Sequence, residues 1–226
     1  MRIGDSLKGK RVLITQCEEF MGPVLTTAFE EHGAVVIGAR GPLADPASAE
    51  AAVAAAGHID ILIANLAVPS PYSPVTAVTD EEWQHVFTHM VDPLPRLARA
   101  ALPAMIARRS GKFIVMGSAV AMRGQKRVST YSAARGAQLS WVRSVGVEVA
   151  PHNVHVNLIA QNFVENPTYY GPDVQALPAF QERLKREVPL GRLARPEEDA
   201  LFAVFLASNE VEFFAGQGIA FAGGWV

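Results

Sequence analysis

The sequence predicts an α/β protein built on a doubly wound parallel sheet of the Rossmann type. Short apolar runs, such as Arg11–Thr15 and Lys112–Ser118, alternate with helical patterns along the whole chain. Near-continuous apolar runs are typical of parallel strands, because helices cover both faces of such a sheet. No linker, repeat or low-complexity segment interrupts the alternation, so we expect one domain over residues 1–226.

Three strands and two helices are expected in the first part of the chain. The strands are rich in Val and Ile, whose branched side chains favour extended backbone. The first helix ends where Gly33 suits a C-terminal cap, and the second helix is rich in Ala. In order, the elements are strand Arg11–Thr15, helix Gly22–His32, strand Ala34–Arg40, helix Pro46–Ala56 and strand Asp60–Asn65.

The second part of the chain continues the alternation. Thr79, followed three residues later by Glu82, forms a capping-box pattern that predicts the start of a long helix, bent at Pro93 and Pro95. Pro196 fits the first turn of a late helix. In order, the elements are helix Thr79–Arg109, strand Lys112–Ser118, helix Ser129–Ala150, strand Asn153–Ala160, helix Pro196–Ser208 and strand Gly218–Ala222.

Composition and charge exclude several classes of protein. The 226 residues are 50% hydrophobic and 19% charged, which is too apolar for a disordered chain. A net charge of -2 gives no reason to expect nucleic acid or an anionic membrane as a partner. The single cysteine, Cys17, excludes an internal disulfide, and no window approaches the roughly 20 apolar residues of a membrane span. Without a recognisable signal peptide, we expect a cytoplasmic protein.

Three polar residues fall where a parallel sheet places its ligands. Ser118 lies at the carboxyl end of a predicted strand, and ligands bind at this edge of such sheets. Tyr131 follows near the start of the long helix, and Arg135 comes one helical turn after Tyr131. Because residues four apart share one face of a helix, the three side chains can converge on one cleft.

This arrangement resembles the short-chain dehydrogenase/reductase superfamily, and the likeness extends over almost the whole chain. The stretch between the strands ending at Arg40 and beginning at Asp60 is too short for a further helix–strand–helix unit. We therefore expect one strand fewer than those dehydrogenases have. The matching features are the Ser118–Tyr131 spacing, Asn65 after the third strand, the run PLGRLARPEEDALFAVFLAS from Pro189 to Ser208, and the pair Gly223 and Gly224.

In two departures from that superfamily, the chain resembles halohydrin dehalogenases. The dehydrogenases carry Lys four residues after the Tyr, where this chain has Arg135. Their first loop reads TGxxxGxG, whereas here Gln16 and Phe20 replace two glycines. Halohydrin dehalogenases combine a Ser–Tyr–Arg triad with a first loop of the form T-x4-[FY]-x-G, which Thr15, Phe20 and Gly22 match.

The resemblance implies displacement of halide from vicinal haloalcohols to give epoxides, with the reverse opening of epoxides by small anions. Tyr131 would be the base, Arg135 would favour its phenolate form, and Ser118 would orient the substrate oxygen. No cofactor and no metal are expected. The glycines that let a backbone approach a pyrophosphate are missing, and the ring of Phe20 would fill the nucleotide's volume.

The same resemblance implies a halide pocket and a homotetramer. In this family the pocket is built from backbone N–H groups and an apolar wall of the loop after the fifth strand, with an aromatic of the first loop. Leu66 stands where some relatives have an acid that relays a proton, and Gln161 where some have Pro. With the short carboxyl end at Trp225–Val226, these features resemble the B-type branch of the family. Relatives pair the helices corresponding to Thr79–Arg109 and Ser129–Ala150 between subunits. The pocket residues are Phe20, Gln161, Asn162, Phe163 and Val164, with Tyr169 and Tyr170 beside them.

Two other classes of function stay open at this point. One is an NAD(P)-dependent short-chain oxidoreductase with a distorted cofactor loop, and the other is a non-catalytic binding protein on the same fold. Phe20 can also be read as ordinary packing, and Arg135 as a helix-surface ion-pair residue. His85 and His89 share a helix face, but no third metal ligand is apparent.

Overall fold

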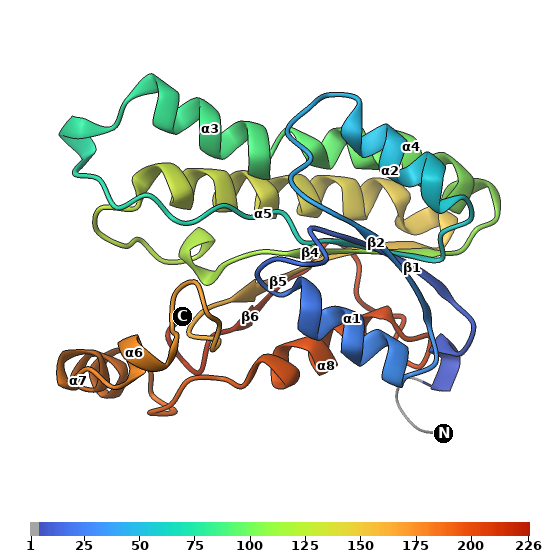
Figure 1. Ribbon diagram of the computed structural model, residues 1–226. Helices are drawn as coiled ribbons and strands as arrows, with labels where there is room; N and C mark the ends of the chain where they lie inside the picture. The colour runs from blue at the N-terminus through green and yellow to red at the C-terminus, as the bar shows by residue number, and fades with distance from the viewer. Residues whose placement is uncertain (1–4) are drawn as a thin grey trace.

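A computed structural model describes residues 5–226, and its sheet has six parallel strands in the order β2-β1-β3-β4-β5-β6 (Figure 1). This confirms the predicted Rossmann-type sheet with six strands. Residues 1–4, at the start of the segment in which we expect no signal peptide, lie outside the described residues. The strands are β1 (Arg11–Thr15), β2 (Val35–Ala39), β3 (Ile61–Ala64), β4 (Gly111–Met116), β5 (Val154–Gln161) and β6 (Gly218–Phe221).

The strand order places a crevice between the carboxyl ends of β1 and β3. The chain runs from β1 to β2 on one side, then returns to add β3 on the other side of β1. Ligands bind in α/β sheets where the strand order reverses in this way. The hydroxyl of Thr15, at the end of β1, donates to the carbonyl of Asn65 after β3 at 3.1 Å and holds the two ends together.

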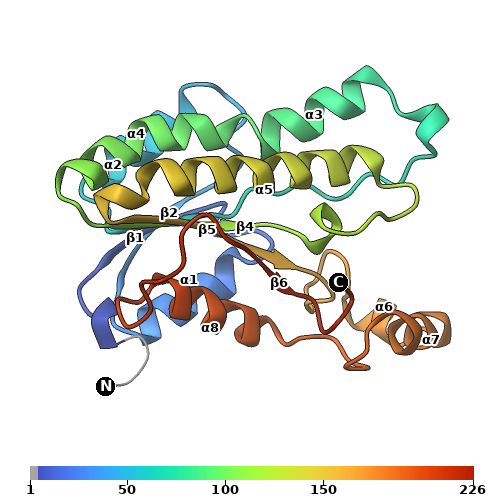
Figure 2. The same ribbon diagram turned by 180° about the vertical axis from the view of Figure 1, so that it is seen from behind.

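Helices cover both faces of the sheet (Figures 1 and 2). On one face, α2, α4 and α5 pack against the strands, with α3 beside α5. On the other face, α1 lies against α8. The helices are α1 (Gly22–Glu31), α2 (Ser48–Ala56), α3 (Asp80–Met90), α4 (Pro93–Ala107), α5 (Ser129–Val149), α6 (Pro172–Gln175), α7 (Pro178–Glu187) and α8 (Pro196–Ala207), with short 3-10 turns η1 (Asp5–Leu7), η2 (Val75–Ala77), η3 (Ala119–Ala121) and η4 (Ala150–His152).

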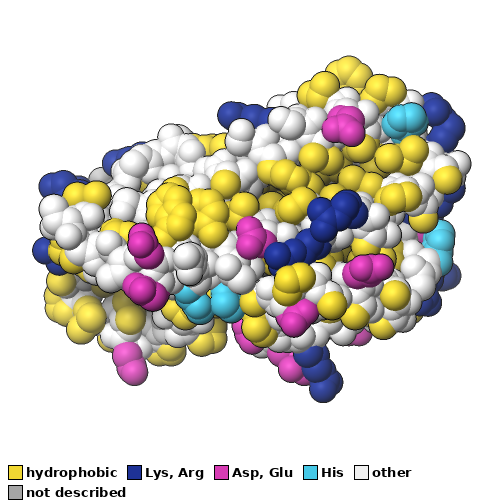
Figure 3. Space-filling view, turned by 90° about the horizontal axis from the view of Figure 1, so that it is seen from above, with side chains coloured by type: hydrophobic (Ala, Val, Ile, Leu, Met, Phe, Trp, Pro, Cys, Tyr) yellow, Lys and Arg dark blue, Asp and Glu magenta, His cyan; other side chains and the backbone are white. Residues whose placement is uncertain are grey.

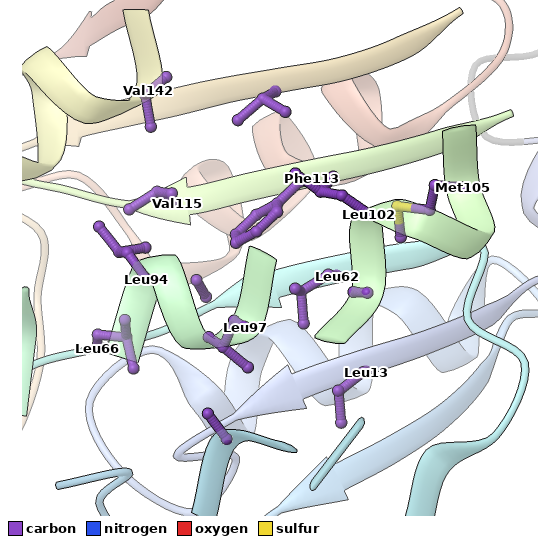
Figure 4. Close-up of a cluster of buried hydrophobic side chains, with 14 of the residues drawn as sticks. Leu13, Leu62, Leu66, Leu94, Leu97, Leu102, Met105, Phe113, Val115 and Val142 are labelled. Atoms are coloured by element: carbon purple, nitrogen blue, oxygen red, sulfur yellow. The ribbon is translucent and has the colours of Figure 1, made fainter. Parts of the chain in front are cut away.

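Large apolar side chains fill the space between the sheet and the layer of α2, α4 and α5. Phe113 of β4 is completely buried there, with Leu94 and Leu97 of α4 against it (Figure 4). Fully burying one such side chain stabilises a fold by roughly 1.5–3 kcal/mol. The continuous burial of β3 and β4 along their length explains why their sequences show no polar alternation.

Two features of the helical layer differ from the sequence prediction. The single bent helix predicted over Thr79–Arg109 is wrong, because α3 ends at Met90 and α4 begins anew at Pro93. Proline lacks the N–H that would continue α3, but it suits the first turn of a new helix. The helices α6 and α7 were not predicted, and they project beyond the carboxyl edge of the sheet (Figures 1 and 2).

The predicted N-terminal cap of α3 is confirmed. The hydroxyl of Thr79 accepts a hydrogen bond from the N–H of Glu82 at 3.1 Å. The Glu82 carboxylate in turn accepts from the hydroxyls of Ser73 and Thr130, at 2.6 and 2.7 Å, which ties α3 to the start of α5. Within residues 5–226, no helix is both long and apolar enough to cross a bilayer.

Candidate active site

A cavity of about 140 Å³ lies at the carboxyl ends of β1, β3, β4 and β5, in the crevice that the strand order predicts. The structure therefore brings together side chains that are far apart in the sequence. All ten residues for which the sequence suggests a role line this cavity: Phe20, Ser118, Tyr131, Arg135, Gln161, Asn162, Phe163, Val164, Tyr169 and Tyr170.

Ser118 and Tyr131 reach the cavity from neighbouring elements. Ser118 follows β4 and caps η3, where its Oγ accepts a hydrogen bond from the N–H of Val120 at 3.4 Å. Since the oxygen accepts, the hydroxyl proton is available for an oxygen in the cavity. Tyr131 lies in the first turn of α5 and is 9% exposed, so its hydroxyl contacts the cavity and little solvent.

Arg135 brings a buried positive charge beneath Tyr131. Its side chain is 3% exposed, and its guanidinium carbon lies 5.0 Å from the centre of the Tyr131 ring. Its Nη1 donates to the carbonyls of Leu66 at 3.1 Å and Met116 at 2.9 Å, and to Oε1 of Gln138 at 2.9 Å. These acceptors are all neutral, so the buried charge favours an anion beside it.

Gln138 holds Arg135 in place, and the sequence analysis missed it. It is completely buried on α5, and its Nε2 donates to the carbonyl of Met90 at the end of α3 at 2.7 Å. The same carboxamide accepts from Arg135, so one side chain links the guanidinium to α3. The available signal was a polar residue three positions after Arg135, which lies on the same helix face.

The other two tyrosines of the cavity are kept protonated. The Tyr169 hydroxyl donates to the carbonyl of Val68 at 3.1 Å and accepts from the N–H of Ser70 at 3.0 Å. Burial raises the pKa of Tyr169, and the nearby Tyr131 phenol raises it further. Burial also raises the pKa of Tyr170 to about 12. Neither phenol can act as a base at neutral pH, which leaves Tyr131 among the three tyrosines that line the cavity.

The backbone of the first loop has positive φ angles at two positions where related dehydrogenases have glycine and this chain does not. Gln16 and Phe20 have φ angles of 43° and 50°, a region that costs other residues roughly 1–2 kcal/mol each. The Asn65 side chain fixes this path by donating to the carbonyls of Gln16 and Glu19 at 3.0 Å each. Gly22 is retained for steric reasons, because a Cβ there would lie 2.3 Å from the carbonyl oxygen of Gln16.

The side chains added to this loop occupy specific places. The Gln16 carboxamide is buried, and it accepts from the N–H of Ala67 at 2.7 Å and donates to its carbonyl at 3.0 Å. The ring of Phe20 lines the cavity. At the start of α1, the N–H of Gly22 donates to the carbonyl of Glu19 at 2.8 Å, and Pro23 has no N–H. The N-terminus of α1 thus offers fewer donors to an anion than an open helix start does.

The loop after β5 forms an apolar wall with few free donors. Phe163 is buried and stacks on Tyr170, with ring centres 5.7 Å apart. The N–H of Asn162 donates to the carbonyl of Phe221 at 3.1 Å, and the N–H of Phe163 donates to Oδ1 of Asn162 at 2.9 Å. Two of the backbone donors that the sequence analysis considered for halide are therefore already used.

The fold and the site define a Rossmann-type protein with a serine and a tyrosine at the carboxyl edge of its sheet. The proteins that are similar to this chain belong to one enzyme family. The family model described as enoyl-(acyl carrier protein) reductase matches residues 7–226. The 3-oxoacyl-[acyl-carrier-protein] reductase of Escherichia coli (strain K12) is 31% identical over 215 residues, covering 89% of this chain and 86% of that protein. A cis-4-hydroxycyclohexanecarboxylate dehydrogenase of Sinomonas cyclohexanicum is 32% identical, over 77% of this chain and 68% of that protein. The chain belongs to the short-chain dehydrogenase/reductase family.

Similar solved structures include proteins of two different activities. One is described as a dehalogenation enzyme; it is 29% identical, with a TM-score of 0.89, and the match covers 98% of this chain and 100% of that chain. Another is a gluconate 5-dehydrogenase from Burkholderia cenocepacia in complex with NADP and tartrate, 25% identical with a TM-score of 0.89 over 99% and 97% of the two chains.

Proposed function

We propose that this chain is a halohydrin dehalogenase, which converts vicinal haloalcohols into epoxides without a cofactor and opens epoxides with small anions. The observation that carries the proposal is the buried guanidinium of Arg135 beside Tyr131, with hydrogen bonds to neutral oxygens alone. An ordinary phenol is almost fully protonated at neutral pH, and an adjacent cation favours the phenolate that the reaction needs as a base.

The reaction follows from the positions of three side chains. Ser118 holds the substrate hydroxyl, and the Tyr131 phenolate takes its proton. The substrate oxygen then attacks the neighbouring carbon, so a C–O bond forms while the C–halogen bond breaks and the halide leaves with its electron pair. Tyr131 later gives the proton to solvent, and the net products are an epoxide, a halide and a proton. No electrons are transferred, so the reaction requires no hydride carrier.

The size of the cavity supports a small substrate. Its volume of about 140 Å³ is close to that of an engineered cavity of about 150 Å³ that binds benzene. A three-carbon haloalcohol has a similar number of heavy atoms. The 29% identity to a structure described as a dehalogenation enzyme is a second, independent support.

The residues of the first loop do not fit a dinucleotide. Phe20 lines the reactive cavity, and the carboxylate of Glu19 lines the groove beside it, where it would repel a pyrophosphate. We therefore expect no measurable binding of NADH or NADPH in calorimetric titrations. Saturable binding in the micromolar range would contradict this expectation.

An NAD(P)-dependent oxidoreductase is the second candidate, and a specific observation favours it. The curated relatives quoted above are a reductase and a dehydrogenase, and one structure of similar shape holds NADP. Reduction of a ketone by NADPH, measured as the decrease in the absorbance of the cofactor, would support this candidate. The dehalogenase proposal predicts no such turnover.

Replacing Arg135 with Gln is expected to lower the rate of halide release at neutral pH at least tenfold. The neutral amide no longer stabilises the negative charge that forms on the Tyr131 oxygen when it takes the substrate proton. Arg135→Lys keeps the cation and should restore part of the neutral-pH rate. Arg143→Gln, on an exposed position of α5, is the matched control. The same rate of halide release in wild type and Arg135→Gln would remove this residue from the mechanism.

We also infer a homotetramer in which the helices before and after β4, namely α3, α4 and α5, pair between subunits. Hydrophobic side chains gather on the helical layer seen from above (Figure 3). On these helices, Trp83 of α3 is 44% exposed and Val147 of α5 is 71% exposed. Exposed apolar surface of this kind is typical of subunit contacts. Light scattering at micromolar concentration should give four times the chain mass of 24.3 kDa, and a monomer mass would contradict the inference.

A further inference from the structure

A second, larger hollow lies directly beside the reactive cavity. It is a groove of about 910 Å³ between the first loop and the segment that follows β5. Four residues line both spaces, namely Phe20, Met21, Asn166 and Tyr170. The proposed reaction takes place in the smaller cavity alone and gives the groove no role.

The volumes of the reactive cavity and of the groove match two parts of one substrate molecule, its reacting carbons and a substituent on them. The reactive cavity of about 140 Å³ accommodates roughly six heavy atoms, the size of a bare three-carbon haloalcohol. The groove falls in the range of about 300–1,000 Å³ that is typical of pockets for larger ligands. Phe20 and Tyr170 border both spaces, so a substituent that extends from the reacting carbons into the groove would run beside their rings.

Most of the groove wall is apolar. The first loop and the start of α1 supply Phe20, Met21 and Val24, and prolines supply much of the rest. Burying apolar substituents against such a wall is favourable, at up to about fourfold in affinity per methylene group. The apolar and proline residues of the wall are Phe20, Met21, Pro23, Val24, Pro69, Pro167, Tyr170, Pro172 and Pro196.

The charges that line the groove are mostly negative. Glu18 is paired with Arg40 at 3.0 Å, and the single lining arginine, Arg195, lies 3.7 Å from Glu198 outside the groove wall. Arg192 binds the same Glu198 carboxylate at 2.7 Å, so Glu198 does not neutralise Arg195. The positive charge of Arg195 therefore offsets only one of the remaining lining carboxylates.

Three further lining carboxylates, Glu19, Glu165 and Glu197, have no ion pair among the described residues. Glu19 accepts from the amide of Gln16 at 2.9 Å, and Glu165 accepts from the amide of Gln175 at 3.0 Å. A neutral amide donor does not compensate a carboxylate, so the groove disfavours an anionic ligand.

We propose that this groove receives an extended, uncharged substituent of the substrate. The inference rests on the proposed dehalogenase function and names its substrate class: haloalcohols and epoxides whose carbon chain or ring continues well beyond the reacting carbons. Substrates whose far end carries a carboxylate or phosphate are rejected by the glutamates of the groove. Phe20 and Tyr170 act as specificity-determining residues, because every such substituent must pass them.

The first experiment measures binding without turnover. Calorimetric titration of the wild-type protein compares 1,2-propanediol, 1,2-octanediol, 7,8-dihydroxyoctanoate and the methyl ester of that acid. The eight-carbon diol and the ester should bind at least tenfold more tightly than the three-carbon diol, and the carboxylate at least tenfold more weakly than its ester. Equal affinities across the series would overturn the proposal. Because diols do not react, this result is independent of whether the chain releases halide.

The second experiment assigns the effect to the groove. Thr168→Trp places a large side chain at the groove wall, and Thr27→Trp makes the same change at an exposed residue of α1 that does not line it. Thr168→Trp alone should lower kcat/KM for 1-chloro-2-octanol at least tenfold, with 1-chloro-2-propanol little affected. Retention of the long-chain preference in Thr168→Trp would place the substituent elsewhere and overturn the proposal.

A charge variant tests the rejection of anions. Glu165→Gln should bring the affinity for 7,8-dihydroxyoctanoate several-fold closer to that for its ester, whereas Glu148→Gln, on an exposed part of α5 outside the groove, should not. An unchanged ratio in Glu165→Gln would contradict the role given to that carboxylate. Long-chain diol binding without halide release from any chlorohydrin would instead refute the dehalogenase function and leave the groove assignment standing.

Discussion

Replacing Tyr131 with Phe should lower the rate of halide release at least 100-fold. A positioned general base contributes about 10²–10⁴-fold to a rate, and the substitution removes only the phenolic oxygen. Tyr169 and Tyr170 cannot take over, because burial raises the pKa of each phenol. The ring volume is unchanged, so packing at this 9% exposed position should remain nearly the same.

The rate is best compared with that of a matched tyrosine variant. Tyr72→Phe removes a hydroxyl at a residue that is 66% exposed and does not line the cavity, so its rate should equal the wild-type rate. Melting temperatures of the three proteins should agree within about 2 °C, because no core side chain changes size. A Tyr131→Phe enzyme that keeps more than a few per cent of the rate would mean that another group removes the proton.

Replacing Asp199 with Val should stabilise the folded protein strongly at neutral and alkaline pH. Asp199 lies in α8 with no exposed surface, and neither carboxylate oxygen has a hydrogen-bond partner among the described residues. Burial raises its pKa to about 8 from the ordinary 3.8. At pH 7 the folded chain keeps a proton that the unfolded chain releases, which costs about 4 kcal/mol.

The pH dependence of this effect has a definite sign. Because the folded-state pKa of Asp199 lies above the unfolded value, its contribution to stability is largest below about pH 4 and is lost as the pH rises to about 8. Asp199→Val should remove this loss and raise the melting temperature at pH 7–8 by roughly 10 °C. Near pH 4 only a smaller gain should remain, because the valine no longer buries an unpartnered carboxyl group.

Urea unfolding from pH 4 to 9 at one protein concentration measures these differences directly. Asp199→Asn is the control, because it removes the titration but keeps a buried polar group. Its stability should share the flatter pH dependence of Asp199→Val and be lower throughout. Parallel pH profiles for wild type and Asp199→Val would show that the carboxyl group is not a buried, unpaired acid.

The strands and the main site were predictable because their signals are local or follow from topology. The apolar runs marked the six strands, and the carboxyl-edge rule brought Ser118, Tyr131 and Arg135 to one cavity. The break between α3 and α4 was harder to predict, since a proline can either bend a helix or begin a new one. The helix α7 carried a signal that was missed, because Pro178 suits its first turn and Phe180 and Leu184 lie four residues apart on its buried face. The helix α6 is a single turn with no buried residue and offers no such signal.

Other features depend on contacts between distant segments and leave little trace in one sequence. Gln138 matters because Met90, on another helix, accepts its amide proton, and the sequence does not indicate that pairing. Asp199 reads as one of several acids in the first turn of α8, and only the packing of α8 shows that it is buried. The donors that Asn162 and Phe163 already use are likewise visible only in the folded loop.

The central claim is that this cavity releases halide from a vicinal haloalcohol with no cofactor present. The direct test incubates the purified protein, dialysed free of nucleotides, with 1,3-dichloro-2-propanol and follows chloride, epichlorohydrin and released protons together. The account predicts that the three products appear in equal amounts, at a rate that added NADPH leaves unchanged. No chloride above the uncatalysed background, or chloride release that depends on NADPH, would contradict it.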